Sequence, residues 1–580
     1  MQRWIPALGW MSQYNRQLFA SDALAAVIVT MMLIPQSLAY ALLAGLPAEM
    51  GLYASILPLV AYAFFGTSRT LSVGPVAVAS LMTATAVGAI AQRGTADYAT
   101  AAVMLAMLGG LMLMILGALR FGFVANFLSH PVVSGFITAS GIIIAISQLR
   151  HILGISAHGD NVLELLSSLT AHVSDSNAYT ATVGGSALLF LWLCRHMLVP
   201  FLVRLGLDQR PSSMVAKAAP VMAIVLTIFA AITWDLEGKG VALVGTVPTG
   251  LPAFSTPLFD WELIKALALP ALLIALIGFV ESVSVGKTLG AKRRQRIDPN
   301  KELIGLGAAN VASALSNGFP VTGGFSRSVV NFDAGAETQA ASILTAGGIA
   351  LAALFLTPML YFLPKATLAA TIIIAVTSLI DLRMIQTAWR YSRSDFYAVS
   401  TTIALTLLFG VEVGVMSGVL VSLGLHLFNT SRPHFAIVGR VPGTEHFRNV
   451  LRHEVETDRR ILSIRIDERL YFANASYLED TVAQQLELHP DVQHVVLMCP
   501  AVNEIDLSAL EALESINLQL SDLGITLHLS EVKGPVMDAL KRSHFLEHLS
   551  GQIFLTQHVA LCAIHASFSG DNDSTSTAIA

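Results

Sequence analysis

The amino-acid sequence predicts a polytopic α-helical membrane protein that ends in a small α/β domain. The 580 residues are 54% hydrophobic and only 13% charged, with a mean hydropathy of +0.66, which is too apolar for a soluble chain of this length. After Arg432 the charge and histidine content rise abruptly. We therefore divide the chain into an N-terminal cytoplasmic lead-in (1–21), a membrane domain (22–430), a linker (431–445), an α/β domain (446–566) and a polar, disordered tail (567–580).

Apolar runs of membrane-spanning length recur from Asp22 to Phe428, and we count about fourteen of them. The first half contains the runs 22–44, 51–66, 72–90, 98–118, 124–148, 180–199 and 214–233. The second half contains the runs 263–286, 301–317, 325–334, 339–359, 364–381, 396–411 and 412–429. Clusters of Lys and Arg fall between spans on one side, which the positive-inside rule makes cytoplasmic. The N-terminus and the α/β domain lie on that same side.

Corresponding spans in the two halves are interrupted in the same way. Pro35 interrupts the first span, Gly74-Pro75 opens the third, and GFPVTGGFSRSVV opens the tenth. Lipid tolerates a broken helix only where the open backbone faces protein or a cavity. The pattern predicts an inverted repeat of about seven spans in each half, whose two short helices meet N-terminus to N-terminus. Two positive helix ends that face one pocket favour an anion.

Two charged residues, Glu281 and Arg327, lie inside these apolar segments. Charges within the membrane are costly and usually mark a transport pathway. Arg327 would supply positive field to the pocket, or would be a structural residue paired with an acid or with carbonyl groups. Glu281 would be its buried partner, or a group that titrates during transport. The basic run at 287–301 is a cytoplasmic topology signal, with lipid headgroup contact a secondary role.

The sequence contains no complete motif for catalysis or for metal binding. His453-Glu454 lacks the second histidine of a zinc hydrolase helix, and Gly305-Leu306-Gly307 lacks the third glycine of a dinucleotide loop. The three cysteines are widely spaced and form no CxxC pair. We therefore expect no enzyme activity, no cofactor, no metal site and no nucleic-acid partner.

Three segments of the membrane part resemble a known family. IPQSLAYALLAGLPAEMGLYAS, FFGTSRTLSVGPVAV and NGFPVTGGFSRSVVNFDAGAETQ are similar to the signature segments of the SulP (sulfate permease) family of anion transporters, and the C-terminal domain resembles a STAS domain. The resemblance implies core and gate domains, an anion held between the third and tenth spans, elevator-like alternating access and a homodimer. It also leads us to expect a bacterial inner (cytoplasmic) membrane protein.

The resemblance assigns the anion pocket to positions in the first, third and tenth spans. In this sequence they are Gln36, Tyr40, Val76, Phe325, Ser326 and Arg327. The hydroxyl of Ser326 and the backbone amides would hold the anion, and Arg327 would supply the positive field. Each of these residues also has a structural alternative, since Ser326 and Gln36 can cap local helix ends and Tyr40 can pack against its neighbours without contacting an anion.

Glu281 matches the eighth-span acid that the family associates with cation coupling. Sodium-coupled relatives place a hydroxyl one helical turn later, where this chain has Val285. This departure disfavours sodium and leaves a proton as the expected coupling ion, because a desolvated carboxyl in the pocket can titrate at a useful pH.

The STAS resemblance rests on NEIDLSALEAL, in which Asp506 and Ser508 match the acid and the phosphorylatable hydroxyl of small regulatory proteins with this fold. The glycine that usually follows is Ala509 here. Ser508 is thus a candidate regulatory phosphosite, and the alternative is that Asp506 or Ser508 only caps a helix. The domain would otherwise provide a dimer contact or a docking surface for a cytoplasmic regulator.

Together these observations predict a secondary active transporter of a small inorganic anion, with sulfate first and bicarbonate next, coupled to protons. The alternatives are a dicarboxylate carrier, a sodium-coupled bicarbonate transporter or an uncoupled anion exchanger. A nucleobase permease fits less well, because those proteins have acids in both the eighth and tenth spans. An anion sensor that signals through its STAS domain is the alternative from a different class.

Overall fold

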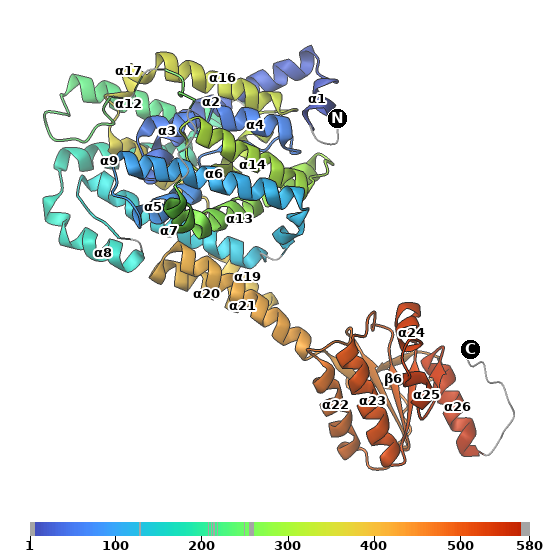
Figure 1. Cartoon of the computed structure of the whole chain (residues 1–580). Coiled ribbons are helices and arrows are strands. Elements are labelled where there is room, and N and C mark those ends of the chain that lie inside the picture. The colour runs from blue at the N-terminus through green and yellow to red at the C-terminus, as the bar shows by residue number, and fades with distance from the viewer. Residues whose placement is uncertain are drawn as a thin grey trace. The chain divides into compact units, whose positions relative to one another are not determined.

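The computed structural model describes residues 6–126, 129–159, 161–206, 208–209, 212, 215–216, 218–246, 248, 250–254 and 260–569. The chain forms two compact units, Met1–Ser422 and Leu423–Ala580, both drawn in Figure 1. The first unit is almost entirely helical, and the second contains a β-sheet with helices.

Every segment that the sequence predicts to span the membrane contains a helix. Within the described residues, seven helices are long and apolar enough to cross a membrane, and five more apolar helices are shorter. The fold class predicted from the sequence is therefore confirmed as a polytopic helical membrane domain. The elements of this unit are α1 (Ala7–Met11), α2 (Arg16–Leu43), α3 (Ala48–Tyr53), α4 (Leu57–Phe65), β1 (Val73–Gly74), α5 (Ala77–Gly88), α6 (Ala96–Ala118), α7 (His130–Leu153), α8 (Val162–Ala171), α9 (Ala178–Leu193), α10 (Val199–Arg204), α12 (Ala219–Thr233), α13 (Trp261–Lys292), α14 (Pro299–Leu315), β2 (Thr322–Gly323), α15 (Phe325–Asp333), α16 (Ala340–Phe355), α17 (Thr357–Leu360), α18 (Lys365–Val376), α19 (Arg383–Tyr391), α20 (Arg393–Phe409) and α21 (Val411–Ser431).

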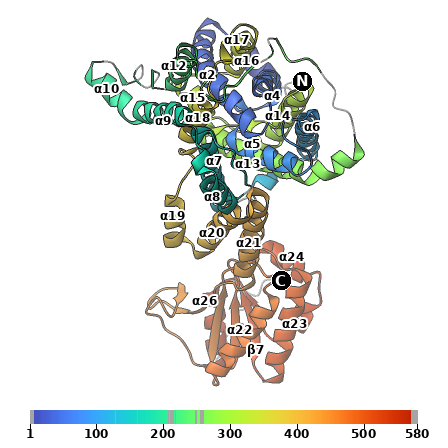
Figure 2. The ribbon, with the colours of Figure 1, turned by 90° about the vertical axis from the view of Figure 1, so that its left-hand side faces the viewer.

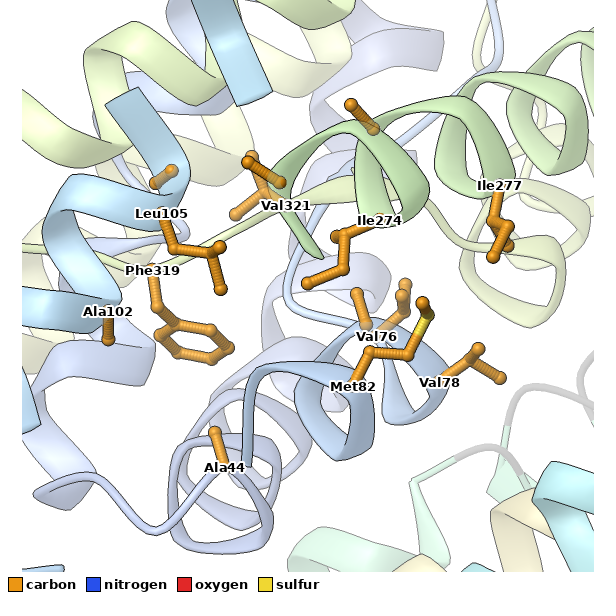
Figure 3. Packing of buried hydrophobic residues seen from close by; sticks show 14 of the residues in the cluster. Ala44, Val76, Val78, Met82, Ala102, Leu105, Ile274, Ile277, Phe319 and Val321 are labelled. Atoms are coloured by element: carbon orange, nitrogen blue, oxygen red, sulfur yellow. The ribbon is translucent and has the colours of Figure 1, made fainter. Parts of the chain in front are cut away.

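One group of helices packs around small residues. A Cβ atom on Gly110 of α6 would lie 2.8 Å from the carbonyl oxygen of Gly307 on α14, and a Cβ on Gly307 would lie 2.8 Å from the Gly110 carbonyl. Small residues allow such close backbone contact between membrane helices, where lipid supplies no hydrophobic drive. The glycines of Gly305-Leu306-Gly307 thus serve helix packing. Figure 3 shows part of the buried cluster beside them, including Leu105 of α6 and Ile274 of α13.

Helix α2 continues through Pro35 rather than ending there. A proline removes one backbone donor but need not end a helix whose sides are supported by neighbours. Here α3 lies directly against the next turn, because a Cβ on Gly51 would lie 1.9 Å from the Ser37 carbonyl oxygen. The Ser37 and Ser55 hydroxyls, 2.7 Å apart, join the two segments.

The second unit contains a six-stranded sheet in the order β4-β3-β5-β6-β7-β8. Strand β3 is antiparallel to β4 and β5, whereas β5 to β8 are mutually parallel. The elements are β3 (Phe435–Arg440), β4 (Phe447–Asn449), β5 (Ile461–Ile466), α22 (Ala475–Leu488), β6 (His494–Met498), α23 (Leu507–Asp522), β7 (Thr526–Ser530), α24 (Gly534–Leu540), α25 (Phe545–His548), β8 (Ile553–Phe554) and α26 (Gln557–Ser569).

The sheet differs from the sequence reading at both ends of the domain. Strand β3 lies inside the segment 431–445 that we assigned to a linker, and it joins the sheet through β5. The sequence analysis placed no strand here, because charged residues flank this short apolar run. Residues 567–569 of the expected tail form the end of α26, and 570–580 lie outside the described residues.

Candidate functional site

The two short helices predicted from the sequence begin at one place in the membrane unit. Strands β1 and β2 pair antiparallel, with Val73 opposite Gly323 and Gly74 opposite Thr322. Helix α5 follows β1 and α15 follows β2, so their N-terminal ends are brought together; Figure 2 shows α5 beside α13. The first backbone N–H groups of each helix have no partner within the helix. The arrangement therefore concentrates positive potential at the paired strands.

Buried polar side chains from α13 and α14 hold β2 in position. The Ser282 hydroxyl donates to the Gly278 carbonyl at 2.6 Å and accepts from the Gly323 backbone N–H at 2.9 Å. The Asn310 amide accepts from the Val321 N–H at 2.9 Å and donates to the Val321 carbonyl at 2.8 Å. These bonds satisfy backbone groups that no lipid could satisfy.

Helix α15 holds β1 in the same manner. The Ser328 hydroxyl accepts from the Ser72 backbone N–H at 3.0 Å and donates to the Gly324 carbonyl at 2.7 Å. The Asn331 amide donates to the Thr70 carbonyl at 3.0 Å. Our sequence reasoning did not single out Ser282, Asn310, Ser328 or Asn331. The sequence feature that could have identified them is a polar side chain within an apolar segment, beside each helix break.

Arg327 lies in the centre of this arrangement. Its side chain is buried, with 2% of the residue exposed, and its Nη2 donates one long hydrogen bond of 3.4 Å to the Thr322 carbonyl. Its Nη1 has no hydrogen-bond partner among the described residues. A Cβ on Gly74 would lie 2.7 Å from Nη1, and one on Gly324 would lie 3.0 Å from Nε. A buried cation with an unpaired donor thus adjoins both glycines, and only an anion would compensate it well.

Tyr40 and Glu281 lie within electrostatic reach of Arg327. Tyr40 on α2 is 7% exposed and interacts with the charges of both Arg327 and Glu281. Glu281 on α13 is partly buried and interacts with Arg327 over a distance. Within the described residues the two charges form no direct ion pair. Glu281 and Arg327 therefore act on one another at a distance and not as a salt bridge in direct contact.

The other predicted pocket residues lie on α2 or at the first turns of α5 and α15, and α2 packs against both short helices. Gln36 is partly buried on α2, about one turn before Tyr40. Phe325 is the first residue of α15 and is 48% exposed. Ser326 belongs to the same first turn, and its side chain lies outside the described part of the chain. Val76 is the N-cap of α5, and its side chain packs with Met82 and Ile274 in the buried cluster of Figure 3.

In the second unit, Asp506 rather than Ser508 caps α23. The Asp506 carboxylate accepts from the Ala509 N–H at 2.9 Å and from the Phe472 N–H at 2.8 Å. Ser508 is exposed in the first turn of the helix. Its hydroxyl is thus accessible and is not needed for the cap.

No cluster of metal-binding side chains occurs among the residues described.

Two broken helices that meet at a buried arginine inside a bundle of apolar spans define a membrane transport protein, with its site at the helix breaks. A model of the sulfate permease family matches residues 19–402, and a model of the STAS domain matches residues 452–560. The chain belongs to the sulfate permease family and has a C-terminal STAS domain. It is a transport protein and not an enzyme, which confirms the resemblance seen in the sequence.

The relatives span plants and bacteria. "Sulfate transporter 4.1, chloroplastic" of Arabidopsis thaliana is 36% identical over 569 residues, which cover 96% of this chain and 80% of the relative. A probable sulfate transporter of Mycobacterium tuberculosis is 31% identical over 565 residues, covering 97% of this chain and 98% of the relative.

Two solved structures share the fold. Murine Solute Carrier 26 family member A9, an anion transporter in the inward-facing state, aligns with a TM-score of 0.86 and 24% identity over 97% of this chain and 94% of its own. The transmembrane domain of the cyanobacterial bicarbonate transporter BicA aligns with a TM-score of 0.60 and 22% identity over 69% of this chain and 98% of its own.

Proposed function

We propose that this protein is a secondary active transporter of a small inorganic anion, with sulfate ahead of bicarbonate. The observation that supports this most strongly is Arg327, a buried guanidinium with an unpaired Nη1 at the junction of two helix N-termini. The names of the relatives, which are called sulfate transporters, support sulfate as the first candidate, and the likeness to BicA supports bicarbonate as the second.

The transport step is an elevator-like displacement of a core against a gate. The paired strands and short helices lie against α13, which packs on α5, α6 and α15. A second set of contacts joins α7 to α18 and α20, and α18 to α9. Except for Gln36 and Tyr40 of α2, the site residues lie on the first set, which can move as a rigid body past the second.

Uptake of labelled sulfate and of labelled bicarbonate into proteoliposomes tests this function. Each anion is offered with an inward proton gradient, a sodium gradient or neither. We expect accumulation of sulfate that is stimulated by protons. Accumulation with sodium alone would favour a sodium-coupled bicarbonate transporter, and gradient-independent flux would favour an exchanger. No flux of either anion would favour a dicarboxylate carrier or a sensor acting through the STAS domain.

Glu281 is the proposed coupling residue. Val285, one turn further along α13, is buried at 4% exposure and offers no side-chain oxygen to a sodium ion, which supports a proton. We expect Glu281→Gln to remove proton stimulation of uptake while anion exchange at symmetrical pH continues. The measurement is the initial uptake rate as a function of external pH, with Glu262→Gln on the same helix as the matched control. An unchanged pH profile would place coupling elsewhere.

We further propose a homodimer in a bacterial inner membrane, with the N-terminus and the STAS domain in the cytoplasm. Ser508 would then face cytoplasmic kinases or a docking regulator. The cysteines provide a topology test, because Cys562 of the STAS domain is exposed while Cys194 and Cys499 are buried. A membrane-impermeant maleimide should label Cys562 in inside-out vesicles only. Labelling in right-side-out vesicles would reverse the orientation, and Cys562→Ser protein is the control.

A further inference from the structure

A cavity of the membrane unit that Arg327 does not line has a strongly basic lining. Its volume is about 550 Å³, and it lies between the C-terminal end of α2, the loop after α7 and the start of α18. Its basic side chains are Arg93, Arg150, His151, His158 and Lys365. Glu49 is the only carboxylate among the described residues that line it. A neighbouring cavity of about 950 Å³ is also bordered by Arg93, Arg150 and His158, so the basic lining continues beyond the first cavity.

These basic residues lie on an unexpected side of the membrane. On the predicted topology the loops after α5, α7 and α17 face away from the cytoplasm, opposite Arg69 and the 287–301 run. The positive-inside rule disfavours Lys and Arg in short loops on that side. Lys365 is also the first residue of α18, where the helix dipole disfavours a cation. Lys365 opposes both tendencies, whereas Arg150 in the last turn of α7 opposes only the first. A basic cluster kept at these positions suggests a function.

The geometry presents donors to the cavity. Arg150 donates from Nε to His151 Nε2 at 3.3 Å and from Nη1 to the Ala157 carbonyl at 3.1 Å. Because His151 Nε2 accepts this bond, the neutral ring carries its hydrogen on Nδ1. Within the described part of the chain, neither that Nδ1–H nor Arg150 Nη2 donates to another residue. Both donors are therefore available to a bound oxyanion.

The positive charges of this cavity lack ion-pair partners among the described residues. Arg93, Arg150 and Lys365 form no ion pair among the described residues, although all three act on His151 electrostatically. In the adjoining loop, burial and then the positive charges of Arg150 and Arg93 lower the pKa of His158. Like charges gathered in one cavity repel one another, and a bound anion would relieve this repulsion.

We propose that this cavity is an outer binding site for a tetrahedral oxyanion such as sulfate, which it captures before the anion reaches Arg327. A water molecule takes up about 30 Å³ in the liquid. The cavity is therefore large enough for an oxyanion together with much of its hydration shell. Arg150, His151 and Lys365 bind the anion, and Arg93 extends the positive field toward solvent. The capture role rests on the proposed anion transport, whereas the binding itself does not.

Sulfate binding to full-length protein purified in dodecyl maltoside, which contains no phosphate, tests the site. An Arg327→Ala background removes the central site, and the sulfate-dependent rise in melting temperature is then measured. We expect a remaining rise that is lost on adding Lys365→Gln or Arg150→Gln. Lys239→Gln is the matched control, because this exposed lysine lies over the Tyr179 ring and does not line the cavity. Lys365→Gln is the safer variant, since the Lys365 side chain forms no hydrogen bond to a described residue.

Two results with sulfate would overturn the proposal. One is an Arg327→Ala protein that shows no sulfate response while wild-type protein transports sulfate. The other is a response that Lys365→Gln and Arg150→Gln leave intact. A short-chain phosphatidylglycerol is titrated in parallel, because a lipid phosphate has the same chemistry. Stabilisation by this lipid but not by sulfate would overturn capture of a free anion.

Transport gives a second readout. In right-side-out vesicles at low ionic strength, Lys365→Gln should raise the KM for external sulfate about tenfold, since a focused positive field raises the association rate by roughly that order or more. The maximal rate should stay unchanged, and added salt should shrink the difference. If wild-type protein moves no sulfate at all, the proposed function fails, while the binding test in detergent still decides the outer site.

Discussion

Replacing Arg327 with alanine should abolish sulfate binding at the central site without unfolding the protein. Truncating one partner of a buried, hydrogen-bonded charge pair costs about 2–5 kcal/mol, which is a loss in affinity of about thirtyfold to several thousandfold. The fold should survive, because Arg327 makes one long bond of 3.4 Å to Thr322 and leaves Nη1 unpaired. Removing an uncompensated buried cation relieves a desolvation cost.

The measurement pairs uptake of labelled sulfate with melting temperature in the absence of anion. We expect uptake to fall to the level of empty liposomes while the melting temperature stays equal or rises. Arg327→Lys is the matched variant, since it keeps the charge but loses the planar fork that binds an oxyanion bidentately. Its sulfate affinity should lie between wild type and alanine. Normal uptake by Arg327→Ala would show that the central site lies elsewhere.

Glu302→Ala should have the largest effect on stability. Glu302 on α14 is fully buried, and its carboxylate accepts from Tyr62 Oη at 2.6 Å, Thr67 N–H at 2.8 Å, Thr67 Oγ1 at 2.5 Å and Ser68 N–H at 3.2 Å. These bonds tie α14 to the end of α4 and to the loop that leads into β1. Alanine would remove the shared acceptor of these donors, of which Tyr62 and Ser68 are buried and Thr67 is partly buried.

Breaking a buried, charge-assisted network of this kind costs about 3–5 kcal/mol. We expect a clear drop in melting temperature and a loss of monodisperse protein on size exclusion. Glu262→Ala is the control, because its side chain is 82% exposed and its ion pair with Lys265 is a surface pair worth at most about 1 kcal/mol. A Glu302→Ala protein as stable as this control would mean that the loop re-forms its hydrogen bonds without the carboxylate.

Much of the membrane architecture follows from the sequence alone. A span must be apolar throughout its length, so each predicted segment could be read directly from local composition. The helix breaks at Gly74-Pro75 and at Gly323-Gly324 were visible because glycine and proline are conspicuous within such a segment. Glu281 and Arg327 were visible for the same reason, since a charge at membrane depth is rare.

Other features depend on residues that are distant in sequence. Ser282 and Asn310 matter because α13 and α14 bring their side chains to β2, and each residue by itself is an ordinary polar side chain. The side chain of Val76 is buried in one cluster with Ile274 because α13 packs on α5. In the STAS domain, β4 and β8 contain three and two residues, too few for an alternating pattern to be recognised.

The sequence by itself therefore determined the class of the protein, the positions of its spans and the two charges of the central site. Lipid imposes those features locally, because every backbone group within one segment must be satisfied there. Only the tertiary structure decided which donors hold the broken helices and whether Glu281 contacts Arg327. It also decided that Arg93 of the loop after α5, Arg150 at the end of α7 and Lys365 at the start of α18 share one cavity. Such choices depend on packing and electrostatics between distant segments, which local composition does not encode.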